Sequence, residues 1–378
     1  MMIHYSLSKL RTKQVTFHQV FAASDSKTLE ELKDLSSKRR AIQESMDESS
    51  SITDAIAREM SGGLTSRLER DIQKLEHYLP LLENLVWEVT LILSNPPMPR
   101  LISELKLRWT SSLTSSPILH SKCFKYYQIN DLRFEYGMVL FLYSTLLRAN
   151  GIENLPKDLA LSATLLRKAA GVYQYLAQQI LPALNTAKAT ERPPESISSV
   201  SSVMSLVCLA EAQAATARKA EEKGNSVSLL AKLHCGVRDL LDEASGILHS
   251  AKKECKNISS HLADFIGTAQ VLHNLKSHKY LAESLQNEGK IGVAIGVLHR
   301  AIKDVGKNSP KDDSWRAVYK HLIQETVELK RKYEHENEFV WHQRIPIPDD
   351  LPSPESVKLV SAISYQSNRV EQRLHFKT

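Results

Sequence analysis

The sequence predicts an almost entirely α-helical protein, and three observations support that fold class. Apolar residues recur at steps of three and four over long segments, which is the period of an amphipathic helix. Glycine and proline, which interrupt helices, number only 13 and 14 among 378 residues. The breakers that do occur lie between the periodic segments, so the pattern indicates successive antiparallel helices with short connections.

The first half of the chain begins with a strand-like arm and continues as helices. Residues 14–21 alternate in part around Phe17 and predict a short strand or hairpin. Pro80 lies inside the longest helical pattern and is expected to kink that helix rather than end it. Asn150 and Gly151 are a C-terminal signal. The predicted helices of this half are 26 to about 44, 64–93, 101–109 and 131–149.

Six further helices are predicted in the second half. Gly224 and Gly289 each interrupt a long apolar pattern, so tight turns are expected there. Small residues at close-packing positions, Ala294 and Ala301, are typical of tetratricopeptide repeats, but the internal periodicity is weak and favours an irregular solenoid. These helices are 159–184, 198–223, 226–256, 261–288, 289–305 and 314–333.

Bulk composition narrows the classes of function. The net charge is +6 and basic runs are short, whereas a dedicated nucleic-acid-binding protein shows clustered basic and aromatic residues. No secretory leader or apolar run of membrane-spanning length is visible, so any membrane contact is expected to be peripheral. The cysteines form no CxxC pair, which predicts reduced thiols in a cytoplasmic protein; they are Cys123, Cys208, Cys235 and Cys255.

The known signatures of catalysis are not found in the sequence. It has no phosphate-binding or dinucleotide-binding glycine motif, no zinc-protease motif and no nucleophile elbow. His273 and His278 are five residues apart, which does not place two metal ligands on one helix face. Acidic pairs such as Glu221-Glu222 lie in polar stretches that are typical of solvated surface. We therefore predict that the protein is not an enzyme and holds no cofactor or metal.

Three segments carry a resemblance to a known family. The first, 133–144, is an apolar helix that follows a loop containing Trp109. The second joins LLRKAAGVYQYL, 165–176, to MSLVCLAEAQ, 204–213, and the third is NEFVWHQRIP, 337–346. In order and spacing these segments resemble the Bro domains of the Alix type, over roughly residues 15–360.

The resemblance implies a fold and a function. The implied fold is one boomerang-shaped domain, here 1–360, with a tetratricopeptide-like helical core and a small N-terminal β-sheet. A short tail, 361–378, is expected to be poorly ordered. Family members bind the C-terminal amphipathic helix of ESCRT-III subunits of the charged-multivesicular-body-protein class in endosomal sorting. The chain resembles stand-alone members such as those of plants, so we expect a cytoplasmic adaptor that is recruited to endosomes.

The family's partner-binding patch also maps onto this sequence. Two aliphatic contact positions fall on Leu229 and Leu233, which are four residues apart and therefore share one helical face. An aromatic position of the family falls on Thr216, a departure that would weaken the groove or alter its preference. Lys219 and Lys232 flank the patch and could steer an acidic partner helix.

Other interpretations stay open for the same residues. Leu229 and Leu233 belong to an apolar stripe that would be assigned to the core without the resemblance, and the flanking lysines would be solvated surface. An alternative function is a helical scaffold of the same fold with a different signalling or cytoskeletal partner, which the departure at the aromatic position favours. Three further lysines could touch anionic lipid, although so few provide little affinity; they are Lys252, Lys253 and Lys256.

Overall fold

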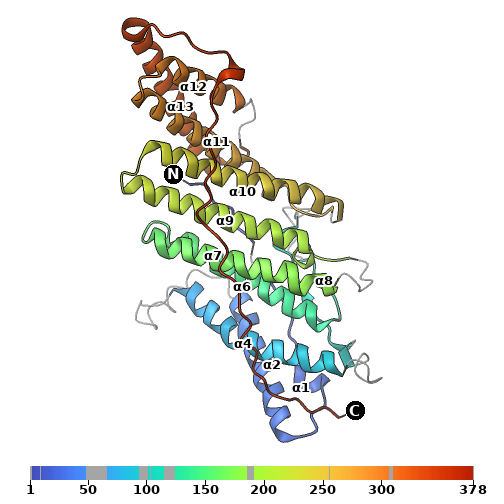
Figure 1. The fold of residues 1–378 in the computed structure, drawn as a ribbon. Helices are drawn as coiled ribbons and strands as arrows, with labels where there is room; N and C mark the ends of the chain where they lie inside the picture. The colour runs from blue at the N-terminus through green and yellow to red at the C-terminus, as the bar shows by residue number, and fades with distance from the viewer. Residues whose placement is uncertain are drawn as a thin grey trace.

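The predicted helical class is confirmed, since 71% of the chain is helical in the computed structural model. The structure describes residues 2–8, 10–47, 66–92, 101–102, 104–114, 124–184, 191–254, 256–305 and 310–377. The long helices lie side by side in an elongated stack (Figure 1). This arrangement agrees with the boomerang-shaped, tetratricopeptide-like fold that the resemblance implied.

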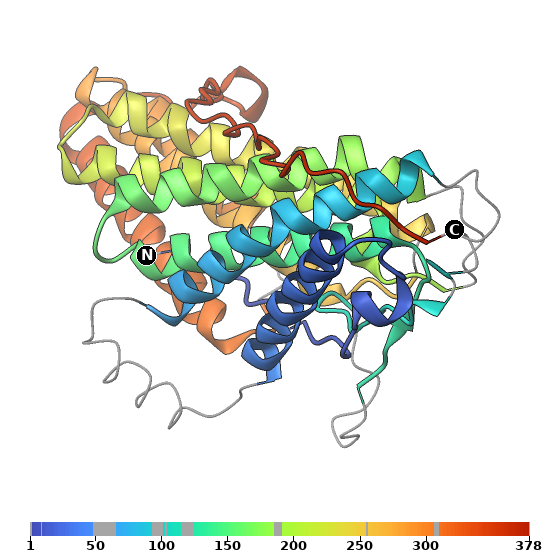
Figure 2. The same cartoon turned by 90° about the horizontal axis from the view of Figure 1, so that it is seen from below.

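Each long helix packs against the next one along the chain. The stack runs from α2 at one end to α12 and α13 at the other (Figure 1). Seen from below, α2 crosses in front of the other helices (Figure 2). The bounds are α2 Ser26–Asp47, α4 Arg67–Leu91, α6 Leu132–Asn154, α7 Leu159–Tyr175, α9 Ser198–Glu222, α10 Val227–Glu254, α11 Ser260–Asn287, α12 Ile291–Asp304 and α13 Asp313–Glu336.

Side-chain caps and glycine turns fix the ends of these helices. Ser66 accepts a hydrogen bond from the Glu69 N–H while the Glu69 carboxylate accepts from the Ser66 N–H, which is a capping box at the start of α4. Asp131, Asp158 and Asp312 cap α6, α7 and α13 through their carboxylates. The two predicted turns are present, because Gly224 and Gly289 adopt φ angles of 67° and 75°.

One core helix is long and apolar enough to resemble a membrane-spanning helix. Among the described residues, α9 alone has the length and hydropathy to cross a membrane, and 78% of its most apolar window is buried inside the fold. Its burial between α7 and α10 is that of a core helix.

The strand expected around Phe17 is wrong. Residues Phe17–Val20 form a single helical turn, α1. Phe17 and Phe21 are both fully buried, and a spacing of four residues places them on one side of a helical turn rather than on one face of a strand. The apparent alternation was therefore a short piece of helical periodicity.

The small sheet that the resemblance implied is built mainly from a later segment. Arg108–Trp109 form β1, which pairs antiparallel with β2, Tyr127–Gln128, and Thr12 bridges to Trp109. The helix expected over 101–109 is thus wrong at its end. The Trp109 indole donates a hydrogen bond of 2.6 Å to the buried Glu135 carboxylate of α6, so the sheet is fixed to the helical stack.

Helix α6 does not end at the predicted signal of Asn150 and Gly151 but continues to Asn154. Gly151 has no room for a side chain, because a Cβ there would lie 2.9 Å from the Leu166 Cγ of α7. The glycine therefore serves the close packing of α6 on α7 rather than a helix end.

After α13 the chain turns back at η3, Asn337–Trp341, and runs as an extended segment along the stack (Figures 1 and 2). We call residues 351–377 the C-terminal segment. It ends beside α1 and α2, where Phe376 pairs with Ala23 and its ring lies 5.5 Å from that of Phe21. The tail that we expected to be poorly ordered is therefore packed on the helices, and Leu374 is buried.

Candidate partner-binding surface

The candidate surface lies where α9 ends and α10 begins. Gly224 turns the chain between the two helices, and the Asn225 N–H donates to the Ala220 carbonyl. Leu229 is in the first turn of α10 and is half-buried, whereas Leu233, one turn later, has no exposed surface. The predicted pair therefore divides, with Leu229 at the surface and Leu233 inside.

Leu233 belongs to a small apolar cluster that closes this end of the two helices. Its buried members are Ala217, Ala220, Leu230 and Leu233, and Leu229 packs against them from the surface. Val357 of the C-terminal segment packs on the same cluster. A direct partner contact by Leu233 would require this packing to open. Leu233 is therefore part of the buried cluster beneath Leu229 and not a second surface contact.

Thr216 provides a shallow position between the two helices. It is half-buried, and its hydroxyl donates a 2.9 Å hydrogen bond to the Ala212 carbonyl of its own helix. The hydroxyl is thereby satisfied without a partner. Compared with an aromatic side chain, this position offers little apolar area.

The two flanking lysines differ in their surroundings. The Lys232 ammonium lies 2.7 Å from the Glu355 carboxylate of the C-terminal segment, and both side chains are substantially exposed. Lys219 is half-buried in the last turn of α9. Of the two, Lys232 is already occupied by a residue of this chain, so its contribution to steering a partner is reduced by that carboxylate.

Sequence reasoning missed the C-terminal segment as a part of this surface. The Val357 N–H donates to the Lys232 carbonyl at 3.2 Å. Gln213, fully buried in α9, donates to the Val357 carbonyl at 2.8 Å and accepts from the Leu359 N–H at 3.0 Å. An extended segment thus crosses α10 and α9 beside Leu229.

Glycines inside two helices were the available signal for this crossing. A Cβ on Gly236 of α10 would lie 2.3 Å from the Val357 carbonyl oxygen, and one on Gly171 of α7 would lie 1.8 Å from that of Ile363. Glycine in a helix interior is costly, so it often marks a close approach of backbone. The glycines could be read from the sequence, but no neighbouring residue indicated which segment of the chain approaches them.

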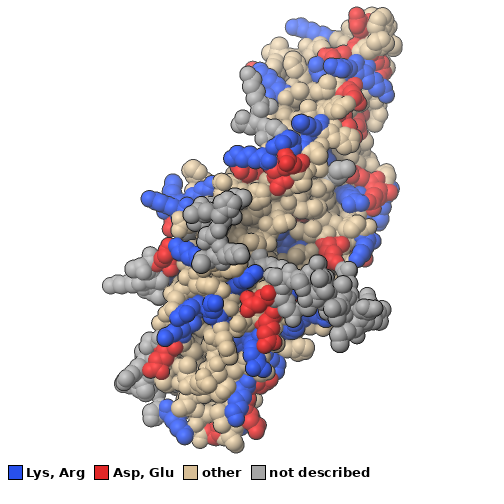
Figure 3. All heavy atoms as spheres, turned by 180° about the vertical axis from the view of Figure 1, so that it is seen from behind, with Lys and Arg blue, Asp and Glu red and all other residues tan. Residues whose placement is uncertain are grey.

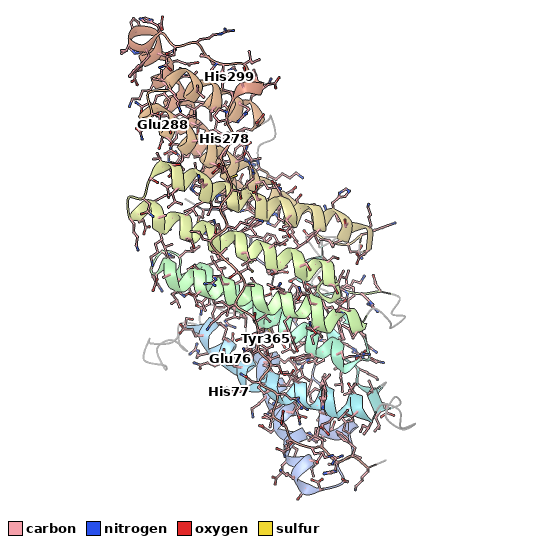
Figure 4. All side chains as sticks on the ribbon, in the orientation of Figure 1. Glu76, His77, His278, Glu288, His299 and Tyr365 are labelled. Atoms are coloured by element: carbon pink, nitrogen blue, oxygen red, sulfur yellow. The ribbon has the colours of Figure 1, made fainter. Side chains whose placement is uncertain are left out.

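Farther along, tyrosines hold the segment against α6 and α7. The Tyr365 ring lies 5.1 Å from that of Tyr175 and 6.5 Å from that of Tyr143. Tyr143 donates a hydrogen bond to Glu76 of α4, and Figure 4 shows Tyr365 close to Glu76. The segment is therefore packed on helices that lie far from it in the sequence.

The three lysines considered for lipid contact lie at the opposite end of α10 from Leu229. Lys253 and Lys256 are exposed and Lys252 is half-buried. At 1.5 Å per residue, Lys252 lies roughly 35 Å from Leu229 along the helix axis. On the face turned away from the C-terminal segment, acidic and basic side chains are interspersed among the described residues (Figure 3).

Helices α9, α10, α11 and α13, together with Met2 and Ile3, line a partly open cavity of about 300 Å³. At one end, the Tyr280 hydroxyl donates to Glu221, whose carboxylate also lies 3.0 Å from His234 Nε2. His234 Nδ1 in turn lies 3.0 Å from His273 Nδ1. These groups form one hydrogen-bonded chain that links three helices.

The electrostatics of this chain favour neutral imidazoles beside a charged carboxylate. Burial lowers the pKa of both His234 and His273. Burial tends to raise the pKa of Glu221, but the hydrogen bond from His234 and the nearby Lys276 overcome this effect and hold it at about 2. None of the described residues that line the cavity is a serine, threonine or cysteine. Among the described residues, no cluster of three His, Cys, Asp or Glu side chains could hold a metal ion.

The buried thiols are poor nucleophiles as well. Burial raises the pKa of Cys208 and of Cys235 above that of a free thiol. Cys235 donates to the Pro354 carbonyl of the C-terminal segment at 3.3 Å. Of the four predicted reduced cysteines, these two are free, and Cys123 and Cys255 lie outside the described residues.

The chain matches the model of the BRO1-like domain family over residues 24–377. It belongs to that family. The resemblance drawn from the three sequence segments is confirmed. The matched BRO1-like region includes both the α9–α10 surface and the whole C-terminal segment. None of the curated protein sequences compared with the chain matches it.

Solved structures share the BRO1-like fold. The ALIX BRO1 CHMP4C complex aligns with a TM-score of 0.68 and 18% identity, over 96% of this chain and 97% of that chain. ALIX in complex with the SIVmac239 PYKEVTEDL late domain gives 0.72 and 16%, over 97% of this chain and 50% of that chain. A Bro1 domain described as a basis for endosomal targeting gives 0.68 and 15%, over 95% and 92%. Identities this low establish the fold alone.

Proposed function

We propose that this BRO1-like protein is an endosomal adaptor that binds the C-terminal amphipathic helix of an ESCRT-III subunit of the charged-multivesicular-body-protein class. The observation that carries the proposal is the half-exposed Leu229 on the α9–α10 surface. A similar fold has been solved as an ALIX BRO1 CHMP4C complex, and another as a Bro1 domain in endosomal targeting. The family is one of adaptors rather than enzymes, in keeping with a surface that offers apolar contact and no reacting group.

A helix fits this surface better than a strand does. Leu229 packs on buried alanines and leucines and extends the apolar area to the surface. Such an apolar surface suits a docked helix whose apolar residues recur at i, i+3, i+4 and i+7. Lys219 adds positive charge at the end of α9 and would favour an acidic partner. The protein would act in the cytoplasm and reach endosomes through this partner, with Lys252, Lys253 and Lys256 as a possible additional contact to anionic lipid.

Binding of the whole chain to fluorescent C-terminal helix peptides of ESCRT-III subunits, CHMP4C among them, tests the proposal. Burying one leucine contributes about 1.5–3 kcal/mol, so Leu229→Asp should weaken binding about tenfold or more. Leu91→Asp is a matched control, since Leu91 is 61% exposed at the far end of α4. Absence of binding by the wild-type chain would reject the proposal.

A helical scaffold with a different partner is the second candidate, and Thr216 favours it. Its hydroxyl turns back to its own helix and leaves a shallow position where the family's groove is aromatic. Under this alternative the wild-type chain binds none of the ESCRT-III peptides, and Thr216→Phe does not create binding.

A further inference from the structure

The α9–α10 surface has a border that does not belong to either helix. The C-terminal segment crosses it one helical turn from Leu229, where the Val357 N–H donates to the Lys232 carbonyl. Val357 packs on the buried cluster under Leu229. Lys358, the next residue, points the other way, toward Glu243 in the C-terminal half of α10 at 3.8 Å.

Leu359, the second residue after Val357, belongs to the same crossing but keeps its side chain at the surface, whereas Val357 packs on the cluster. It is 59% exposed, which places it among the most exposed large apolar residues described. Its N–H donates a hydrogen bond of 3.0 Å to the side-chain Oε1 of Gln213. An exposed leucine at a backbone-fixed position is a ready contact for an apolar partner.

The crossing is a firmly held part of the surface. The Gln213 side chain binds the Val357 carbonyl and the Leu359 N–H, and the Lys232 carbonyl accepts from the Val357 N–H. Gly236 admits the Val357 carbonyl so closely that any side chain would collide with it. Because these groups hold the segment in place, a partner meets Leu359 without first having to order it.

We propose that the partner-binding surface of this protein is composite, with Leu229 of α10 and Leu359 of the C-terminal segment as its two apolar walls and Thr216 between them. This inference rests on the proposed function and adds the residue that completes the site. Leu359 supplies apolar area next to the position where Thr216 supplies little. The surface then has two apolar sides, as a groove for a helix requires.

The occupant is an amphipathic helix rather than an added β-strand. Strand addition needs free backbone N–H and C=O groups on the segment. At the crossing, the Val357 N–H, the Val357 carbonyl and the Leu359 N–H are all used by α9 and α10. That edge of the segment is therefore closed to an added strand, and the exposed side chains of Leu229 and Leu359 offer apolar contact to a helix.

The test compares two exposed apolar residues of the same segment. Leu359→Asp should weaken binding of the fluorescent ESCRT-III helix peptides by about fivefold or more, since a carboxylate would enter an apolar contact. Leu359→Met keeps an apolar side chain and should bind like the wild type. Val370→Asp is the matched control, because Val370 is 40% exposed on the segment but lies near Leu32 and Leu85, far from α10.

The outcomes separate this inference from the proposed function. If Leu229→Asp weakens binding while Leu359→Asp binds as tightly as the wild type, the composite surface is overturned and the adaptor function stands. An equal loss in Leu359→Asp and Val370→Asp also overturns it, because the effect would then come from added charge on the segment. If the wild-type chain binds none of the peptides, both proposals fall.

Discussion

Gln213 in α9 holds Val357 of the C-terminal segment, 144 residues away in sequence, through a hydrogen bond of 2.8 Å from its side-chain amide to the Val357 carbonyl. The same amide accepts from the Leu359 N–H, so one buried side chain replaces the hydrogen bonds that a neighbouring strand would make. This pairing fixes the segment across the proposed partner site and makes the segment part of the folded core. The first prediction follows from it.

Gly236→Ala should destabilise the protein, because the new Cβ would lie 2.3 Å from the Val357 carbonyl oxygen. We expect a loss of about 1–3 kcal/mol, since relief requires the backbone to shift. Thermal unfolding measures it, and Gly246→Ala is the control in the same helix. Gly246 has no heavy atom near its Cβ position, so alanine there should stabilise by about 0.5–1 kcal/mol. Equal effects from both substitutions would contradict the close approach.

Aspartate at Leu233 should destabilise the protein strongly, whereas aspartate at Leu229 should have little effect on its stability. Leu233 is fully buried, so Leu233→Asp places a carboxylate in an apolar cluster and should cost several kcal/mol, roughly 3 or more. Leu229→Asp should change the free energy of unfolding by less than about 1 kcal/mol, because Leu229 reaches solvent. Urea unfolding of both variants distinguishes the support residue from the surface residue. A strongly destabilised Leu229→Asp would show that Leu229 belongs to the core.

Arg148→Met should be strongly destabilising. Arg148 binds the Glu211 carboxylate through two nitrogens at 2.7 and 2.5 Å and also donates to the Tyr5 carbonyl, all in the interior. Its removal leaves Glu211 buried without its cation, at a cost of about 3–5 kcal/mol. Lys290→Met, which breaks the exposed pair with Glu288, should cost less than about 1 kcal/mol. Adding Glu211→Met to Arg148→Met should recover part of the loss, whereas a further loss would argue against this account.

Stability should fall as the pH drops below about 6.5. Burial lowers the pKa of four histidines in the folded protein, namely His4, His234, His273 and His278. Between their folded and unfolded pKa values the unfolded chain binds more protons, so protonation favours unfolding. Melting temperatures at pH 7.5, 6.5 and 5.5 should decrease in that order.

The pH effect has its own control in His273→Gln. Burial lowers the pKa of His273 well below its ordinary value, and this variant removes that histidine. The melting temperature of the variant should therefore decrease less between pH 7.5 and 5.5 than that of the wild type. A melting temperature that stays constant over this range in the wild-type chain would show that the buried histidines do not control acid stability.

Local patterns predicted most helices because apolar residues recur along them at helical spacing and because turn and capping residues lie between them. The turns at Gly224 and Gly289 and the start of α2 fall where the sequence placed them. The errors came where a local signal had two physical causes. Phe17 and Phe21 satisfied both a strand and a helical turn, and Gly151 satisfied both a helix end and a close helix contact.

By itself, the sequence determined the helical class, the order of the helices and the family, because these depend on periodicity and on motifs that are contiguous in the chain. Only the tertiary structure decided that Leu233 is inside while Leu229 is at the surface, and that the Leu359 N–H is bound to Gln213 of α9. Helical spacing tells which residues share a face, but not which second segment covers that face. That choice is made by packing and hydrogen bonds between residues more than a hundred positions apart.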